Sequence, residues 1–414
     1  MGEIKQRDYM FDTFRGLLIL SIPMSHFTKM AGNQYGAMYL TSGFPEESFF
    51  GFMYITINVF VMQAFMFLSG YFSKKPDRAQ ETAFSTFMWP YLVFTVIYYF
   101  VRMFFMGGAN LKLLTPPFAL WFLFVLFFYR FFLKYMVKFQ WLLPVSIMLY
   151  LLAGQVEEFG NLLSLGRALS YFPFFLLGYY CSKERLAWLQ QLKKKPVMLA
   201  LLGIVLVGIT FLLMRSDIKV GWYLLKASVD NFPNMMWWED TLMRIALLFI
   251  ASGWIIFMVN IIPSKKSFLS FVGMNTMPIY VFHLTLRYVV EFYGIYVGVI
   301  SCFVVAWFAV ISLVHRKCCN SLEEETVARK RIYDVIYGIV IAISIAAFYL
   351  LYSSGALSPL YELVPENIYF LYVLVYGGAL LCGISFVSPF WIKLYDLLVD
   401  GPINGSKLAK WLQN

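Results

Sequence analysis

Long apolar runs separated by short polar segments fill most of this chain. A helix needs about 17–25 mainly apolar residues to cross a bilayer, and about twelve stretches approach that length. The fifth of them is short, and the ninth contains Pro278. The pattern predicts an all-α polytopic membrane protein with about twelve transmembrane helices. The predicted spans are 10–28, 51–72, 86–106, 116–135, 139–154, 164–181, 196–214, 240–260, 270–291, 295–314, 332–352 and 369–390.

Composition and charge support this class of protein. Hydrophobic residues make up 61% of the chain and charged residues 14%, whereas soluble domains are about one quarter charged. If the N-terminus lies in the cytoplasm, most of the 33 Lys and Arg residues fall on the cytoplasmic side of the predicted helices. This asymmetry follows the positive-inside rule and predicts that both termini are cytoplasmic. The net charge of +10 therefore reflects topology, and we predict no nucleic-acid partner.

One long polar stretch, His315 to Asp334, divides the predicted helices into two groups. It follows the tenth span, so the chain reads as a ten-helix core followed by a helix pair. His315 itself stands beside Arg316 and Lys317, and we interpret it as a solvated group. The five cysteines show no spacing typical of a zinc site, and no metal is predicted. The predicted domains are a membrane core (1–315), a cytoplasmic connector (316–331), an additional transmembrane pair (332–392) and a cytoplasmic tail (393–414).

The first apolar run carries three ionisable residues, Asp12, Arg15 and His26. Arg15 and His26 are eleven residues apart, which on a helix is a rotation of roughly 20° and a rise of about 16 Å. Asp12 lies three residues before Arg15, on the same stripe. Charges inside a membrane usually face a bundle interior or a wet cavity. The alternative is structural: Asp12 and Arg15 form an ion pair at the interface, and His26 bonds to a neighbouring helix.

Further polar residues share helical faces in other spans. In the ninth span, His283 lies on one stripe with Tyr280 and Arg287, at a predicted depth similar to that of His26. Asn58 and Ser69 are again eleven residues apart, in the second span. At the outer ends, Trp121 and Arg167 are candidates for substrate binding, as is the i,i+4 pair Asp240 and Arg244. For each of these side chains the alternative is a structural role, in helix packing or membrane anchoring.

Several segments resemble one known family. The opening stretch RDYMFDTFRGLLILSIPMSHF is similar to the start of the acyltransferase 3 family of integral membrane acyltransferases, in which an acid and an Arg-Gly pair precede a histidine by about ten residues. FMFLSGYF, LWFLFVLFF, FPFFLLGYY and GMNTMPIYVFHL follow in the family's order. The nearest likeness is to the branch of fucose 4-O-acetylase-like proteins.

The resemblance implies a multi-pass protein of the cell membrane with a ten-helix catalytic core. Such a core moves an acyl group, usually acetyl from acetyl-CoA, to an extracytoplasmic or lipid-linked carbohydrate. The family histidine corresponds to His26 and the family arginine to Arg15. Many members also carry an R-x-x-R-type motif that serves the donor just before the third span. Here that segment is ETAFSTFMWPY, without Arg or Lys, and we expect Lys74, Lys75 and Arg78 to replace it in binding the cofactor.

These observations combine into one mechanistic hypothesis. The phosphates of coenzyme A meet Arg15 and the nearby basic residues, and the pantetheine arm extends towards His26. The predicted catalytic residues are His26, Arg15 and Asp12. Among them, His26 acts as general base on a sugar hydroxyl. Asn58, Tyr280 or His283 supply hydrogen bonds to the oxyanion, and an acyl-histidine intermediate remains an open variant. The rival hypothesis is a secondary transporter or flippase for a glycan or lipid-linked sugar.

Overall fold

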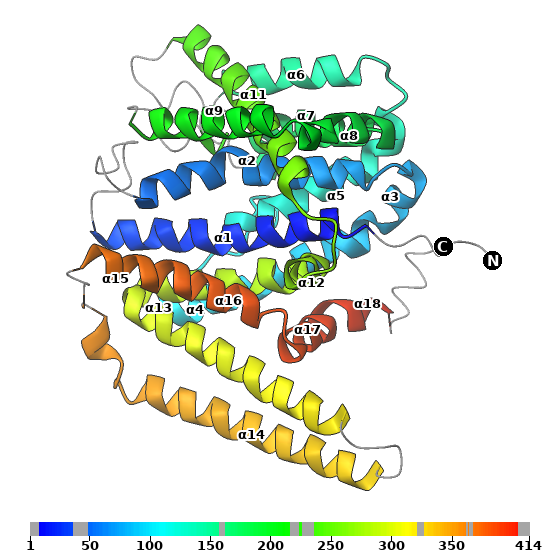
Figure 1. Cartoon of the computed structure of the whole chain (residues 1–414). Helices are drawn as coiled ribbons and strands as arrows, with labels where there is room; N and C mark the ends of the chain where they lie inside the picture. The colour runs from blue at the N-terminus through cyan, green and yellow to red at the C-terminus, as the bar shows by residue number, and fades with distance from the viewer. Residues whose placement is uncertain are drawn as a thin grey trace.

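The computed structural model describes residues 8–35, 49–156, 162–215, 223–225, 236–320, 327–361, 363 and 367–404. Within these ranges all regular structure is helical, which confirms the predicted all-α class for the described part of the chain (Figure 1). The helices of the first half are α1 (Met10–Tyr35), α2 (Phe49–Tyr71), α3 (Pro76–Ala83), α4 (Trp89–Met106), α5 (Trp121–Met136), α6 (Leu142–Leu152), α7 (Leu165–Tyr180), α8 (Lys183–Leu189) and α9 (Pro196–Arg215). Those of the second half are α11 (Trp237–Ile261), α12 (Phe268–Met274), α13 (Thr276–Asn320), α14 (Val327–Ser353), α15 (Ile368–Tyr372), α16 (Gly378–Ser385), α17 (Pro389–Tyr395) and α18 (Gly401–Asn404).

Six helical segments of the described chain are long and apolar enough to cross a membrane. A seventh span is formed if the two segments Tyr369–Ser385 and Pro389–Ile403, bent by 68°, count as one. These helices support a membrane protein, whereas the predicted number of twelve spans and the cytoplasmic location of both termini stay predictions. The difference in number has three main sources. Helices α5, α6 and α7 are shorter than a full span, and α1 is less apolar. Helix α13 counts as one segment although two spans are predicted there.

Helix α13 joins two of the predicted spans across a sharp reversal. Gly294 has φ 82° and ψ 177°, a conformation that favours glycine. A methyl group placed on Gly298 would lie 2.2 Å from Cγ2 of Val290. Two residues eight positions apart on a straight helix are separated by about 12 Å, so the chain folds back at Gly294. The two halves of α13 therefore pack against each other.

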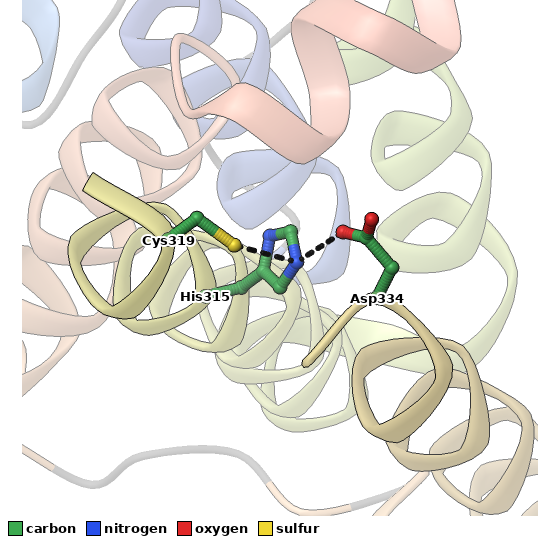
Figure 2. Close-up of side chains that lie close together, drawn as sticks. All are labelled: His315, Cys319 and Asp334. Carbon is green, nitrogen blue, oxygen red and sulfur yellow. Dashed lines mark hydrogen bonds and ion pairs between the residues drawn. The ribbon is translucent and has the colours of Figure 1, made fainter. Parts of the chain in front are cut away.

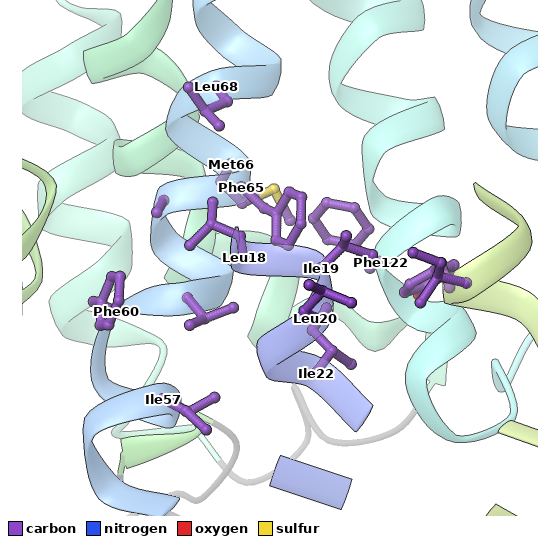
Figure 3. Packing of buried hydrophobic residues seen from close by; sticks show 14 of the residues in the cluster. Leu18, Ile19, Leu20, Ile22, Ile57, Phe60, Phe65, Met66, Leu68 and Phe122 are labelled. Carbon is purple, nitrogen blue, oxygen red and sulfur yellow. The ribbon is translucent and has the colours of Figure 1, made fainter. Parts of the chain in front are cut away.

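Two glycine crossings set the positions of the central helices. A Cβ atom on Gly16 would lie 2.0 Å from the carbonyl oxygen of Leu269, and one on Gly273 would lie 1.7 Å from that of Asp12. Gly70 and Gly178 bring α2 and α7 together in the same reciprocal way. Backbones approach this closely where no side chain intervenes. Figure 3 shows the apolar core that α1 and α2 build beside Phe122 of α5.

The C-terminal region has one peripheral and one embedded part. The apolar window of α14 is 6% buried, as expected of a helix that faces lipid. His315 ties it to α13: its Nε2 lies 2.8 Å from Oδ1 of Asp334 and 3.4 Å from Sγ of Cys319 (Figure 2). The His315 side chain is 16% exposed and Asp334 is 55% exposed, so this pair lies near the surface, and the interpretation of His315 as a solvated group stays a prediction.

The segments that follow α14 return to the body of the protein. Helix α16 packs against α1 and α13, and the indole of Trp391 in α17 donates to the carbonyl oxygen of Val305. The predicted domain boundaries stay predictions, and parts of the predicted connector and tail (321–326 and 405–414) lie outside the described residues.

One end of the bundle gathers the start of α1 with α3, α12 and α17 (Figure 1). Tyr9 donates its N–H to the carbonyl oxygen of Ser264, and the indole of Trp89 donates to that of Val399. The charge distribution predicts that this end is cytoplasmic, and we call it the inner end. The opposite end is called the outer end.

Candidate active site

Two cavities lie one above the other along α1. The outer cavity, about 90 Å³ in volume, is lined among others by Ser25, His26, Asn58, Trp121, Arg167 and Tyr171. The inner cavity, about 340 Å³, is lined among others by Arg15, Ser69, Phe72, Thr86, Phe87 and Arg130. Ile22 and Tyr280 belong to both linings. The two cavities therefore adjoin at these two side chains.

His26 is held by a second histidine. Its Nδ1 lies 2.9 Å from Nε2 of His283, and the two rings stack with centroids 5.1 Å apart. Nδ1 of His283 lies 2.8 Å from the carbonyl oxygen of Ile279. A carbonyl oxygen only accepts, so Nδ1 of neutral His283 carries the proton and its Nε2 accepts one from His26. In this arrangement Nε2 of His26 is the unprotonated nitrogen, which is the form a general base requires.

Asn58 and Tyr280 use their donors within the protein. The amide nitrogen of Asn58 donates to Oγ of Ser25 at 3.0 Å and to the carbonyl oxygen of Tyr54 at 2.7 Å. The hydroxyl of Tyr280 donates to the carbonyl oxygen of Ala119. Both side chains line the cavity as expected. Neither has a spare donor for an oxyanion in this structure.

Arg167 supplies the positive charge of the outer cavity. Its guanidinium carbon stands 4.9 Å from the ring centroid of Trp121, within the range of a cation–π contact. Among the described residues, no carboxylate forms an ion pair with Arg167. The predicted residues Trp121 and Arg167 thus contact each other, and both line the outer cavity.

In the inner cavity, Arg15 is positioned by Asp12. Asp12 is 3% exposed and forms an ion pair and hydrogen bond with Arg15. The guanidinium carbon of Arg15 also stands 5.2 Å from the centroid of the Phe72 ring. Ser69 lies in the same lining. Arg15 and His26 therefore share one face of α1, as the spacing predicts, but they face different cavities with Ile22 between them.

Six predicted site residues are absent from both linings: Asp12 and His283 contact the lining residues Arg15 and His26, and the other four lie elsewhere. Arg287 pairs with Glu291 at 3.0 Å, one turn beyond His283. The ammonium group of Lys74 donates to the carbonyl oxygens of Gly178, Tyr179 and Cys181, at the end of α7. Lys75 and Arg78 are exposed.

Several cavity residues were not predicted from the sequence, and three of them are Ser25, Tyr171 and Arg130. Ser25 is adjacent to His26, and Tyr171 lies on the same face of α7 as Arg167, so both follow from known neighbours. Arg130 lies at the inner end of α5 and lines the inner cavity. In the sequence it is one of many basic residues near a span end, where it reads as a topological charge.

Comparison with known proteins places the chain in a family. Residues 8–315 match the acyltransferase 3 family, described as an acyltransferase domain. The match covers well over half of the chain, and it includes both cavities. The protein is thus a membrane acyltransferase, and it belongs to the acyltransferase 3 family. No curated protein and no solved structure matches the chain.

Proposed function

We propose that this protein is an O-acyltransferase of the cell membrane and belongs to the fucose 4-O-acetylase-like branch. It moves an acyl group, acetyl in the simplest case, from acyl-CoA at the inner end to a hydroxyl group of an extracytoplasmic or lipid-linked carbohydrate. The observation that carries this proposal is the histidine pair at the outer cavity. That cavity adjoins the inner cavity, which is lined by Arg15 and Arg130.

The reaction needs one proton acceptor and one proton donor, and His26 serves as both. Nε2 of His26 takes the proton of the acceptor hydroxyl while its oxygen forms a bond to the thioester carbonyl carbon. The C–S bond then breaks, and the leaving thiolate takes the proton from the imidazolium. The products are the O-acyl sugar and free CoA. His283 is a positioning residue that fixes the tautomer of His26, in the way an orienting partner does in a catalytic triad.

The oxyanion formed during transfer needs a positive charge or hydrogen-bond donors nearby. The donors of Asn58 and Tyr280 are engaged with protein acceptors, which makes both weaker candidates than the sequence suggests. Arg167 lines the same cavity as His26. We therefore assign to Arg167 the role of stabilising the negative charge on the carbonyl oxygen.

The test is acyl transfer by purified protein in lipid nanodiscs. Radiolabelled acetyl-CoA is supplied with a panel of sugars and lipid-linked sugars, and label in the sugar and release of free CoA are both measured. His26→Ala should lower transfer by about 10²–10⁴-fold, the usual contribution of a general base, without changing the melting temperature. Ser21→Ala is the matched control on α1, because Ser21 lines neither cavity and bonds to its own helix.

Two results would contradict the proposal. Unchanged transfer by His26→Ala would remove the histidine from the chemistry. Uptake of sugar into proteoliposomes without any consumption of acyl-CoA would favour the rival hypothesis of a transporter or flippase.

A further inference from the structure

The inner cavity holds two arginines from different helices. Arg15 comes from α1, and Arg130 comes from α5 on the other side of the cavity. The Nε atoms of both side chains are buried and have no hydrogen-bond partner in the described structure. Guanidinium N–H groups are strong donors that are costly to leave unsatisfied. Both side chains therefore keep unused donor capacity inside the protein, and both line the same cavity.

Arg130 is the less satisfied of the two. Its Nη2 donates to Oγ1 of Thr82 at 2.9 Å, and its guanidinium carbon lies 5.3 Å from the centroid of Phe87. No carboxylate pairs with it in the described part of the chain. A neighbouring charged group is Arg78, a second cation. A partly buried cation without a counter-ion is unfavourable, which points to an anionic ligand at this position.

The charge balance of the cavity leads to the same conclusion. The charge of Arg15 is compensated by Asp12, whereas that of Arg130 is not compensated by any described carboxylate. The lining thus carries a net positive charge. Thr86, Thr276 and Phe87 also line the cavity, and most of the remaining lining is apolar.

This set of groups fits one class of ligand. Arginine forks bind phosphate oxygens in a bidentate manner, and aromatic faces stack on nucleobases. A ligand with both features is a nucleoside diphosphate ester. Building on the proposed function, we propose that Arg130, together with Arg15, binds the diphosphate of the acyl-CoA donor in the inner cavity.

The position of Arg130 explains how the chain manages without basic residues before the third span. Its contacts, Thr82 and Phe87, both lie in the segment ETAFSTFMWPY, which has no Arg or Lys. The guanidinium group reaches this place from α5 instead. Lys74, by contrast, donates its hydrogen bonds to three carbonyl oxygens at the end of α7. The donor site is thus built from residues distant in sequence.

The experiment measures binding of coenzyme A to the full-length protein in nanodiscs, by calorimetry at constant salt. Arg130→Gln should weaken CoA binding about 10- to 100-fold, and Arg130→Lys should fall in between because it keeps the charge and loses the fork. The affinity for dephospho-CoA should fall by the same factor from wild type to Arg130→Gln, because dephospho-CoA retains the diphosphate. Lys134→Gln is the matched control: it removes a positive charge one turn later on α5, where Lys134 pairs with Asp77 at the surface.

A second readout separates ligand binding from a structural role. Arg130→Gln removes a cation without a counter-ion, so the ligand-free variant should melt at or above the wild-type temperature. Transfer of acetyl from acetyl-pantetheine, which lacks the diphosphate, should be equal in wild type and variant. If the glutamine variant does not fold, Arg130 is structural and the proposal is overturned.

The remaining outcomes distinguish this proposal from the function on which it rests. If the wild type binds CoA and transfers acetyl, but Arg130→Gln binds CoA equally well, the assignment of Arg130 alone fails. If the wild type neither binds CoA nor consumes acetyl-CoA with any acceptor, the proposed function fails and takes this assignment with it.

Discussion

Arg244 and Arg130 are both arginines set into an apolar bundle, yet their surroundings differ. Arg244 is 3% exposed and pairs with Asp240 at 3.1 Å. It also donates to the carbonyl oxygen of Tyr150 and to Oγ of Ser170. Gln155 donates to the same carboxylate at 2.7 Å. This network joins α6, α7 and α11, and it lies outside the two cavities.

Arg130 has one hydroxyl partner and faces a cavity of about 340 Å³. The difference shows how a buried charge can be assigned a role. A charge whose donors are all matched inside the protein holds helices together. A charge with unmatched donors beside a cavity is kept for a ligand. Substitutions at the first kind of site should lower stability, and those at the second kind should lower binding or catalysis while the fold persists.

The largest expected effect is on stability, at the network of Arg244. Arg244→Met leaves Asp240 buried without its cation, which typically costs about 3–5 kcal/mol. Size-exclusion chromatography and thermal unfolding in detergent should show little folded protein. The double variant Arg244→Met, Asp240→Leu should recover part of the stability, because no unpaired charge remains. A folded Arg244→Met protein that has lost acyl transfer would instead give Arg244 a functional role.

A smaller effect, on catalysis, is expected at His283. His283→Ala removes the group that fixes the tautomer of His26, and transfer should fall on the order of 10²-fold, the lower end of general-base effects. Steady-state kinetics should show the loss in kcat with little change in KM for acetyl-CoA. Arg130→Gln should instead raise the KM for acetyl-CoA with little change in kcat. A raised KM for the donor in His283→Ala would place His283 in donor binding.

Much of the site was predictable because it depends on local spacing. The eleven residues between Arg15 and His26 put both side chains on one face of α1, and both do line cavities. The histidine pair was within reach of the same reasoning, since both spans run in the same predicted direction. The separation into two cavities was not predictable, because Ile22 and Tyr280 carry no pattern that marks them.

The unpredicted features depend on contacts between distant segments. Arg130 reaches Thr82 across 48 positions of sequence, and near the end of a span a basic residue usually reports topology. Lys74 looks like a phosphate ligand in sequence, but the tertiary fold places the end of α7 beside it. The same limit applies to the spans, because an apolar run does not reveal that α13 folds back at Gly294.

A moderate effect is expected at Arg167 in the outer cavity. Arg167→Gln keeps a polar side chain over Trp121 and removes the charge, so kcat should fall about tenfold. This is less than the 10²–10³-fold typical of a fixed oxyanion-hole donor, because the contact recorded for Arg167 is with a ring rather than with a reacting group. Arg167→Lys should recover part of the activity. Equal kcat in wild type and Arg167→Gln would exclude a role in stabilising the oxyanion.

The smallest effect is expected at Lys74, which brings the comparison back to satisfied charges. Its ammonium group meets three carbonyl oxygens at the end of α7, where a cation stabilises the helix terminus by about 0.3–1 kcal/mol. Lys74→Met should therefore lower the melting temperature slightly and leave CoA affinity unchanged. The melting temperature and the CoA affinity are both measured on full-length protein in nanodiscs, as for Arg130→Gln. Lys75→Met is the matched control, because Lys75 is the exposed neighbour in sequence. A loss of CoA affinity as large as that of Arg130→Gln would show that Lys74 belongs to the donor site. In that case, satisfied hydrogen-bond donors would no longer identify a charged residue as structural.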